Sequence, residues 1–122
     1  MSPLLGPYQY EPAENGLPPR EVRIVDLRGE PYPEDGHRIR VHITLTPFKE
    51  KPDLLVVLAT LDGVEISSVN IIETIDDQMT LTMHIRTKTL ENTYLLKAQV
   101  TYAETGIVDQ KSIPIEASVK EE

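Results

Sequence analysis

The sequence predicts an all-β domain, a seven-stranded antiparallel sandwich of two sheets. Hydrophobic residues recur at every second position over most of the chain after residue 20, which is the period of a strand with one buried face. No stretch of ten or more residues carries the helical period. Turn residues separate the alternating segments at short intervals, a pattern typical of an antiparallel sandwich and shared by the small barrels that are its main alternative.

Three segments show this alternation most clearly, at residues 37–46, 79–86 and 94–102. In each of them one parity is mainly apolar and the other carries the polar residues, so each is expected to bury one face. With the other runs that are rich in β-branched residues, seven strands are predicted. Their ranges are 21–28, 37–46, 54–62, 64–75, 79–87, 94–103 and 107–119.

Three local signals refine the predicted strands. The first strand changes its apolar parity between Ile24 and Val25, which predicts a bulge or a strand that leaves one sheet for the other. Asp62 and Gly63 stand between two β-branched runs and predict a two-residue hairpin, because glycine supplies the positive φ that the turn needs. Pro114 lacks an N–H for the ladder, so the last strand is predicted to be an edge or bulged strand.

The N-terminal nineteen residues differ in composition from the remainder of the chain. They hold five of the ten prolines and no Val, Ile or Thr, and carry no strand or helix period. We therefore predict an arm over residues 1–19, partly mobile, and the sandwich domain over residues 20–122. The arm is expected either to move freely or to dock on the body or on a second subunit.

Charge and composition exclude several kinds of partner. With 12 Lys and Arg against 20 Asp and Glu, the net charge is -8, which argues against broad binding of nucleic acid or of an anionic membrane. The absence of cysteine excludes disulfides and thiol chemistry. No segment has the form of a signal peptide or membrane span, so the cytoplasm is the default location that we expect, with export left open.

Residues 90–119, LENTYLLKAQVTYAETGIVDQKSIPIEASV, resemble the last two strands of immunoglobulin-like and fibronectin type III-like domains of bacterial proteins. In that family a Leu shortly before a Tyr leads into an alternating strand, a glycine-containing hairpin and an edge strand. The resemblance implies an immunoglobulin-like sandwich in which Tyr94 is the corner tyrosine, its hydroxyl bonded to backbone a few residues upstream. It also implies adhesion, spacing or partner binding and no particular reaction. The chain lacks the Trp and the cysteine pair of antibody domains.

Cations gather on one expected surface. If the second and fifth strands pair, their solvent faces bring together Arg38, Arg40, His42, His84, Arg86 and Lys88, with Arg23 nearby. Like charges that face each other destabilise a sheet, so we expect interleaved acids to relieve them, or else a bound anion or acidic partner. The expected acids are Glu21, Asp26 and Glu73.

The same surface suggests a weaker metal hypothesis. His42 and His84 lie on strands expected to be neighbours, where two imidazoles with a carboxylate would suit a transition metal. No third ligand is signalled by spacing, so no metal and no cofactor are predicted.

Residues 54–61 are apolar on both parities, so a sandwich leaves one of them outside. The outer set is either Leu54, Val56 and Leu58 or Leu55, Val57, Ala59 and Leu61, and we take the second as the expected interface. Val69, Ile71 and Ile72 of the next strand would widen it. Such a strip is seldom left in water, which predicts a cover from the arm or a loop, from another protein or from a second copy in a homodimer.

No catalytic motif is present: the chain has no GxSxG, HExxH, Walker loop, GxGxxG or calcium loop. Tyr8, Tyr10 and Tyr32 could form an aromatic platform for sugars, or simply pack on the domain. The sequence therefore predicts a non-catalytic interaction or structural module that binds itself or another protein. The alternative is a ligand-binding module that holds an anion or metal on the Arg/His face.

Overall fold

The computed structural model describes residues 16–33, 35–87 and 90–116 of the chain. These residues form seven strands and one short 3₁₀ helix, and no α-helix occurs among them. None of the described residues belongs to a helix that is long and apolar enough to cross a membrane. The elements are η1 (Pro19–Glu21), β1 (Ile24–Tyr32), β2 (Asp35–Leu45), β3 (Asp53–Thr60), β4 (Glu65–Ile71), β5 (Gln78–His84), β6 (Thr93–Tyr102) and β7 (Gly106–Glu116).

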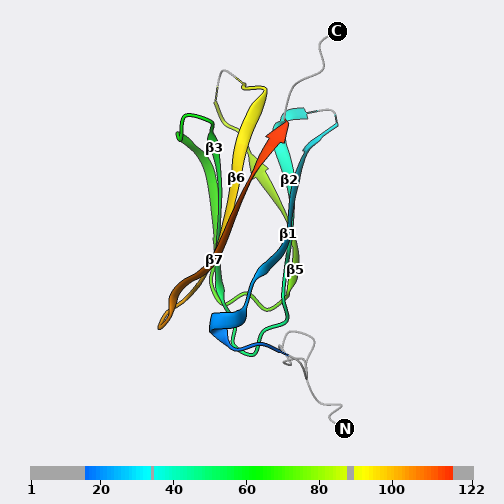
Figure 1. The fold of residues 1–122 in the computed structure, drawn as a ribbon. Coiled ribbons are helices and arrows are strands. Elements are labelled where there is room, and N and C mark those ends of the chain that lie inside the picture. The colour runs from blue at the N-terminus through cyan, green and yellow to red at the C-terminus, as the bar shows by residue number, and fades with distance from the viewer. Residues whose placement is uncertain (1–15, 34, 88–89, 117–122) are drawn as a thin grey trace.

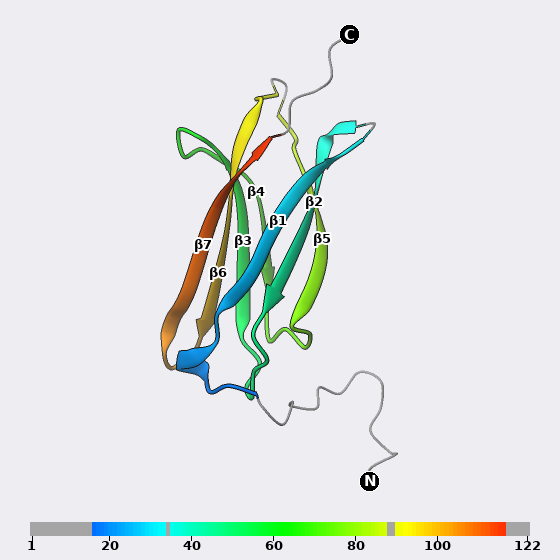
Figure 2. The same cartoon turned by 45° about the vertical axis from the view of Figure 1, so that its right-hand side comes forward.

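The strands form two antiparallel sheets that face each other (Figure 1). One sheet has the order β1-β2-β5 and the other the order β4-β3-β6-β7. β1 lies beside β7 along one open side of the sandwich, as Figure 2 shows. The predicted all-β sandwich is therefore confirmed, and the barrel alternative is excluded because no ladder joins the two sheets in the part of the chain that the structure describes.

Alternate residues of the two sheets meet in the core. Ile39, Val41 and Ile43 of β2 face inward and are at most 1% exposed. On β3 the inward set consists of Leu54, Val56 and Leu58, each 0% exposed. Each such side chain stabilises the fold by about 1.5–3 kcal/mol relative to an exposed one. The period of two in the sequence thus fixes which residues are left for the outer faces.

The first strand contains the predicted bulge. Its register against β2 shifts between Ile24 and Asp26. Ile24 and Leu27 are buried on either side of the shift, whereas Val25 is 57% exposed. β1 stays paired with β2 beyond the bulge, so the alternative of a strand that changes sheets is wrong.

The β3–β4 hairpin forms where the sequence predicted it, but its turn is longer. β3 ends at Thr60 and β4 begins at Glu65. The N–H of Gly63 donates to the carbonyl of Thr60 at 2.9 Å, and Gly63 has φ of 94°. Asp62 has no positive φ, whereas a two-residue type I′ turn needs one at both central positions. The predicted two-residue loop is therefore wrong, and glycine instead closes a longer turn in the left-handed region.

The end of the predicted arm packs on the body. The N–H of Leu17 donates to the carbonyl of Pro47 at 3.1 Å, and the N–H of Lys49 donates to the carbonyl of Leu17 at 3.0 Å. Leu17 also packs against the core and forms a bridge with Phe48. Residues 1–15, the larger part of the predicted arm, lie outside the described residues.

The last strand lies at an edge of the four-stranded sheet, next to β6. Pro114 faces Leu95 in the ladder, and β7 has no second neighbour to which its residue 114 would need to donate. The predicted edge position is thus confirmed. The predicted extension of this strand to residue 119 lies beyond the described residues, which end at Glu116.

Gly29 of β1 sits where a side chain would meet the core. A Cβ at this position would lie 2.7 Å from Cδ1 of Ile115 and 3.2 Å from Cδ2 of Leu96. We expect Gly29→Val to lower the free energy of unfolding by about 1–3 kcal/mol, because overpacking displaces well-packed neighbours. Urea unfolding would measure this change. Ser112→Val on the exposed face of β7 is the control, expected within about 0.5 kcal/mol of the unsubstituted chain; equal effects of both substitutions would contradict the argument.

Candidate functional site

The outer face of the β1-β2-β5 sheet carries the predicted cations. Here the cationic face means Arg38, Arg40 and His42 of β2 with His84 of β5. In the β2–β5 ladder Arg38 faces His84, Arg40 faces Thr82 and His42 faces Thr80. Arg86 follows the end of β5 and is exposed, and Lys88 lies outside the described residues. The pairing of the second and fifth strands, on which the predicted surface depended, is confirmed.

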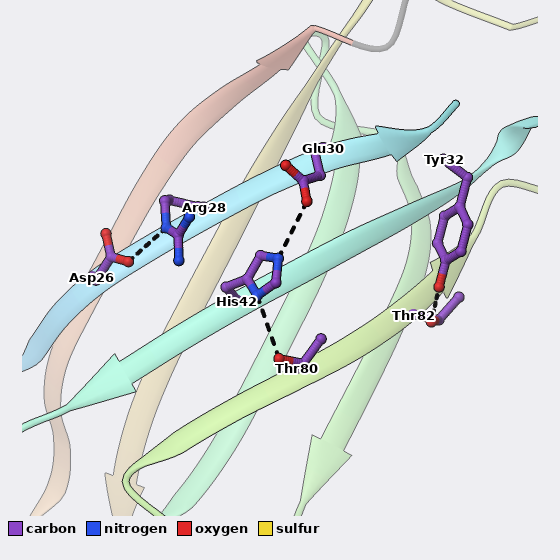
Figure 3. A network of polar contacts seen from close by, with 7 residues as sticks. All are labelled: Asp26, Arg28, Glu30, Tyr32, His42, Thr80 and Thr82. Atoms are coloured by element: carbon purple, nitrogen blue, oxygen red, sulfur yellow. Dashed lines mark hydrogen bonds and ion pairs between the residues drawn. The ribbon is translucent and has the colours of Figure 1, made fainter. Parts of the chain in front are cut away.

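Tyr32 organises one end of this face. The guanidinium carbons of Arg38 and Arg40 lie over its ring, 4.2 Å and 4.6 Å from the centroid. The Tyr32 hydroxyl reaches across β2 to β5, where it is 2.7 Å from Oγ1 of Thr82 (Figure 3). This hydrogen bond is the largest cause of a lowered pKa of Tyr32, which Arg40 and Arg38 also lower and which burial opposes. Two cations, an aromatic ring and a hydroxyl are thereby held together at the solvent surface.

His42 links the three strands further along the face. Its Nε2 lies 3.4 Å from Oε2 of Glu30 on β1, and its Nδ1 lies 3.3 Å from Oγ1 of Thr80 on β5 (Figure 3). The Nε of Arg28 donates to Oδ2 of Asp26 at 2.8 Å on the same face. These contacts form a polar ladder that runs across the sheet from β1 to β5.

Most of the carboxylates that the sequence predicted to lie among the cations are not found beside them. Asp26 is on this face but pairs with Arg28. Glu21 lies in η1, and Glu73 lies beyond the end of β4, where its N–H donates to Oδ1 of Asp53 at 2.9 Å. The prediction was therefore wrong for Glu21 and Glu73, and Glu30 is the carboxylate that contacts a predicted cation.

Two of the arginines have contrasting surroundings. No described carboxylate lies within 4.0 Å of the Arg40 guanidinium, although Glu30 is its neighbour in the β1–β2 ladder. Arg23 does not join the face, because its guanidinium donates to the backbone carbonyls of Arg20 at 2.9 Å and Val22 at 2.8 Å. Arg23 is thus bonded to backbone outside the cationic face, whereas Arg40 lies on that face without a described carboxylate partner.

The register separates the two histidines of the metal hypothesis. His42 faces Thr80, and His84 faces Arg38, which is four residues away along β2 or roughly 13 Å. They do not form the facing pair that the hypothesis required. No group of three metal-ligating side chains occurs within residues 16–33, 35–87 and 90–116.

The outer face of the four-stranded sheet carries an apolar strip, defined here as Leu55, Val57 and Ala59 of β3 with Leu95 of β6. All four are half-buried, and they line a hollow of about 290 Å³. The hollow is also lined by Gly63, Glu65, Lys97 and Gln99. Three of the four predicted interface residues thus share one surface, and the fourth, Leu61, lies in the β3–β4 turn, 63% exposed.

The strip is narrower than the sequence predicted. Val69 and Ile71 of β4 pack against the core instead of the outer surface, so the expected widening is wrong for both. Ile72 is exposed but follows the end of β4. On β4 the residues facing Val57 and Leu55 are Ser68 and Asn70, which border the strip with polar groups.

Tyr94 has the geometry that the family resemblance implies. Its hydroxyl accepts a hydrogen bond from the backbone N–H of Glu91 at 2.9 Å, three residues upstream. The side chain is 1% exposed and is the largest fully buried one among the described residues. The contact fixes the entry into β6 and has a structural role.

Sequence reasoning missed the contacts of Tyr32 and Glu30. The Pro31-Tyr32-Pro33 segment has the composition of a loop, which hid that β1 extends to Tyr32. The signal that could have found them is the parity after the bulge, which places Arg28, Glu30 and Tyr32 on one face.

Comparison with known proteins shows a fold and no family. No family model matches the sequence, and no curated protein matches it by sequence. Among solved structures, the chain is similar to a β-glucuronidase from Ruminococcus gnavus in its apo form, at 17% identity and a TM-score of 0.51. The complex of a Ruminococcus gnavus β-glucuronidase with D-glucaro-d-lactam gives 16% identity and a TM-score of 0.52. Each match covers 79% of this chain and 16% of the other.

The surroundings of Tyr32 lead to a test of the cationic face. We expect Thr82→Val to raise the pKa of Tyr32 toward its ordinary value of 10.0, because the substitution removes the hydrogen bond that lowers it most. Thr80→Val, on the same strand and face, should leave this pKa unchanged. A titration followed by NMR of ¹³C-labelled tyrosine would measure both variants.

The hydrogen bond of Tyr32 to Thr82 also determines how the free energy of unfolding changes with pH. A folded-state pKa below the unfolded value means that the unfolded chain binds more protons between the two values, so the free energy of unfolding rises with pH in that window. The contribution is lost as the pH falls through the lowered pKa. An unchanged titration of Tyr32 in Thr82→Val would contradict the assigned cause.

Proposed function

We propose that this chain is a non-catalytic interaction domain that binds a protein partner through the apolar strip. The observation that carries the proposal is that Leu55, Val57 and Ala59 point to solvent from a central strand of the four-stranded sheet. Outward positions of a sandwich are ordinarily polar. Apolar side chains gathered on such a face are typical of a protein-binding surface.

The shape of the strip favours a protruding side chain of the partner. Apolar residues form its centre, and Glu65, Lys97 and Gln99 border it with polar groups. An apolar centre with a polar rim is the usual arrangement of a binding hot spot. Because the strip consists of one side of β3 and a single residue of β6, it matches an apolar side chain inserted into the hollow better than the flat face of a second sandwich.

The comparisons support a role as one part of an assembly. The similar region makes up 16% of each of the two compared β-glucuronidase chains, so a sandwich of this kind occurs there beside much additional protein. The Tyr94 contact agrees with the fibronectin type III-like resemblance, a family that serves adhesion, spacing and partner binding. We take no catalytic activity from these similarities.

A second candidate function is the binding of an anion on the cationic face. The observation that favours it is Arg40, which is held over Tyr32 beside Arg38 and has no described carboxylate within 4.0 Å. A guanidinium positioned in advance binds a sulfate, phosphate or carboxylate through charge-assisted hydrogen bonds. The metal alternative is set aside because His42 and His84 do not face each other.

The primary proposal predicts the effect of one charge on the strip. We expect Val57→Lys to reduce the amount of partner retained from an extract of the source cells by about tenfold or more, since the substitution removes apolar contact and places a charge in the hollow. Quantitative mass spectrometry of the proteins held by the immobilised domain would measure this change. Gln110→Lys adds the same charge on the same sheet and should retain the partner. Equal retention by Val57→Lys would refute the assigned surface.

The second candidate is tested by thermal unfolding at constant ionic strength. Sulfate, phosphate and acidic sugars are each added, and a ligand that binds only the folded chain raises the midpoint. We expect a smaller rise for Arg40→Gln than for Arg28→Gln, whose charge is already paired with Asp26 on the same face. Identical shifts for the two variants would show that the anions act without this site.

A further inference from the structure

β5 is the sheet edge that carries the least protection against pairing with another strand. Edge strands usually contain bulges, prolines or charged side chains that prevent such pairing. β1 has its bulge and Pro31, and β7 has Pro114. The ladder of β4 with β3 is irregular, because Leu58 of β3 faces Ser67 and the next residue, Ala59, faces Glu65. β5, by contrast, contains no Pro, Gly, Lys or Arg, and its register with β2 is unbroken.

The backbone of β5 offers hydrogen-bonding groups at this edge. The N–H of Leu45 donates to the carbonyl of Asp77 at 2.7 Å, and the N–H of Ile85 donates to the carbonyl of His37 at 2.7 Å. Directly bonded pairs alternate with non-bonded pairs in an antiparallel ladder, so the odd-numbered residues of β5 bond to β2. The even-numbered residues direct their N–H and C=O groups away from β2, toward the open edge. These are Gln78, Thr80, Thr82 and His84.

The core is also incompletely covered along this edge. Met79 and Leu81 face inward but are only half-buried. Their partners on β2, Ile43 and Val41, are 1% and 0% exposed. A strand added beside β5 would therefore complete the cover of two apolar side chains as well as bond the free backbone groups.

The sequence of β5 is suited to pairing with itself. Residues 79–83 read MTLTM, which is the same in both directions around Leu81. An antiparallel pair with its twofold axis at Leu81 sets each of residues 79–83 opposite its own kind: Leu81 opposite the partner's Leu81, Thr80 opposite the partner's Thr82, and Met79 opposite the partner's Met83. Threonine pairs on one face and apolar pairs on the other are favourable cross-strand combinations.

We infer that two copies of this chain associate through antiparallel pairing of β5, which joins their three-stranded sheets into one continuous sheet of six strands. Around the axis the one ionisable residue of β5, His84, lies opposite the partner's Gln78, so no like charges face each other on the paired strands. The inference rests on the proposed function only in treating the domain as an interaction module. It uses a different surface from the apolar strip.

Pairing about Leu81 fixes the contacts of the dimer. The two Leu81 residues form a non-bonded pair, with Cβ atoms about 4.5–5.5 Å apart. Thr80 exchanges backbone hydrogen bonds with the partner's Thr82, since both direct these groups to the open edge. The side-chain bonds of Thr80 to His42 and of Thr82 to Tyr32 lie on the outer face and are retained.

The first experiment is sedimentation velocity of the full chain over a range of concentrations. We expect a monomer–dimer equilibrium whose Kd rises about tenfold or more in Thr80→Pro. Proline at this position removes an edge donor and leaves the backbone bonds to β2 in place, but it also removes the side-chain bond of Thr80 to His42. Thr80→Val, which loses the side-chain bond alone, is therefore the matched control and should dimerise as the unsubstituted chain does. Val57→Lys, on the apolar strip, should dimerise as the unsubstituted chain does.

A second experiment does not depend on the folding of the proline variant. The chain contains no cysteine, so Leu81→Cys places a single thiol on the twofold axis, where mild oxidation should link two copies. Ser68→Cys, on the outer face of β4, is the control and should link far more slowly. Equal rates of linkage would overturn the inference.

The outcomes separate this inference from the proposed function. A chain that stays monomeric at every concentration overturns the β5 pairing and leaves partner binding by the apolar strip to its own test. A dimer that Val57→Lys dissociates and Thr80→Pro does not also overturns the pairing, and assigns self-association to the strip. A dimer weakened by Thr80→Pro and linked through Leu81→Cys supports it, whatever the strip binds.

Discussion

The packing of alternate residues between the two sheets is the constraint on which the remainder of the structure depends. Val41 of β2 and Val56 of β3 are both fully buried, and so are their inward neighbours two residues away. Once one parity of a strand is buried, the other is committed to solvent, and a slip of one residue would exchange the two sets. The same packing therefore places Arg40 on one outer surface and Val57 on the other.

The two outer surfaces of the sandwich differ in chemistry. The three-stranded sheet presents a polar ladder whose members bond across strands, from Glu30 through His42 to Thr80. The four-stranded sheet presents apolar side chains such as Val57 in its middle and polar groups around them. Water hydrates the polar groups of the first surface, whereas the exposure of the apolar side chains of the second surface to water is unfavourable. Burial against another protein is therefore more favourable for the apolar strip.

Much of the fold follows from the sequence because the polarity of each residue in an alternating strand indicates whether its side chain faces the core or the solvent. The alternation over residues 37–46 and 79–86 gave the inward faces of β2 and β5, and the parity change near Val25 gave the bulge. Contacts between strands depend on the register in which the strands pair. A shift of two residues keeps the same face buried, so the alternating pattern does not distinguish registers that differ by two. For this reason the sequence indicated that His84 would lie near β2 but could not show that it faces Arg38.

The polar ladder and the open edge of β5 are physically connected. Thr82 is bonded to Tyr32 and Thr80 to His42, so the outer face ties β5 to β2 and to β1 beyond it. Both side-chain bonds depend on the register of β5, and the β2–β5 ladder contains no bulge. An edge without a bulge is also the geometry that a further antiparallel strand requires. The cross-strand contacts of the cationic face thus maintain the edge on which self-pairing depends, whether or not an anion binds to Arg40.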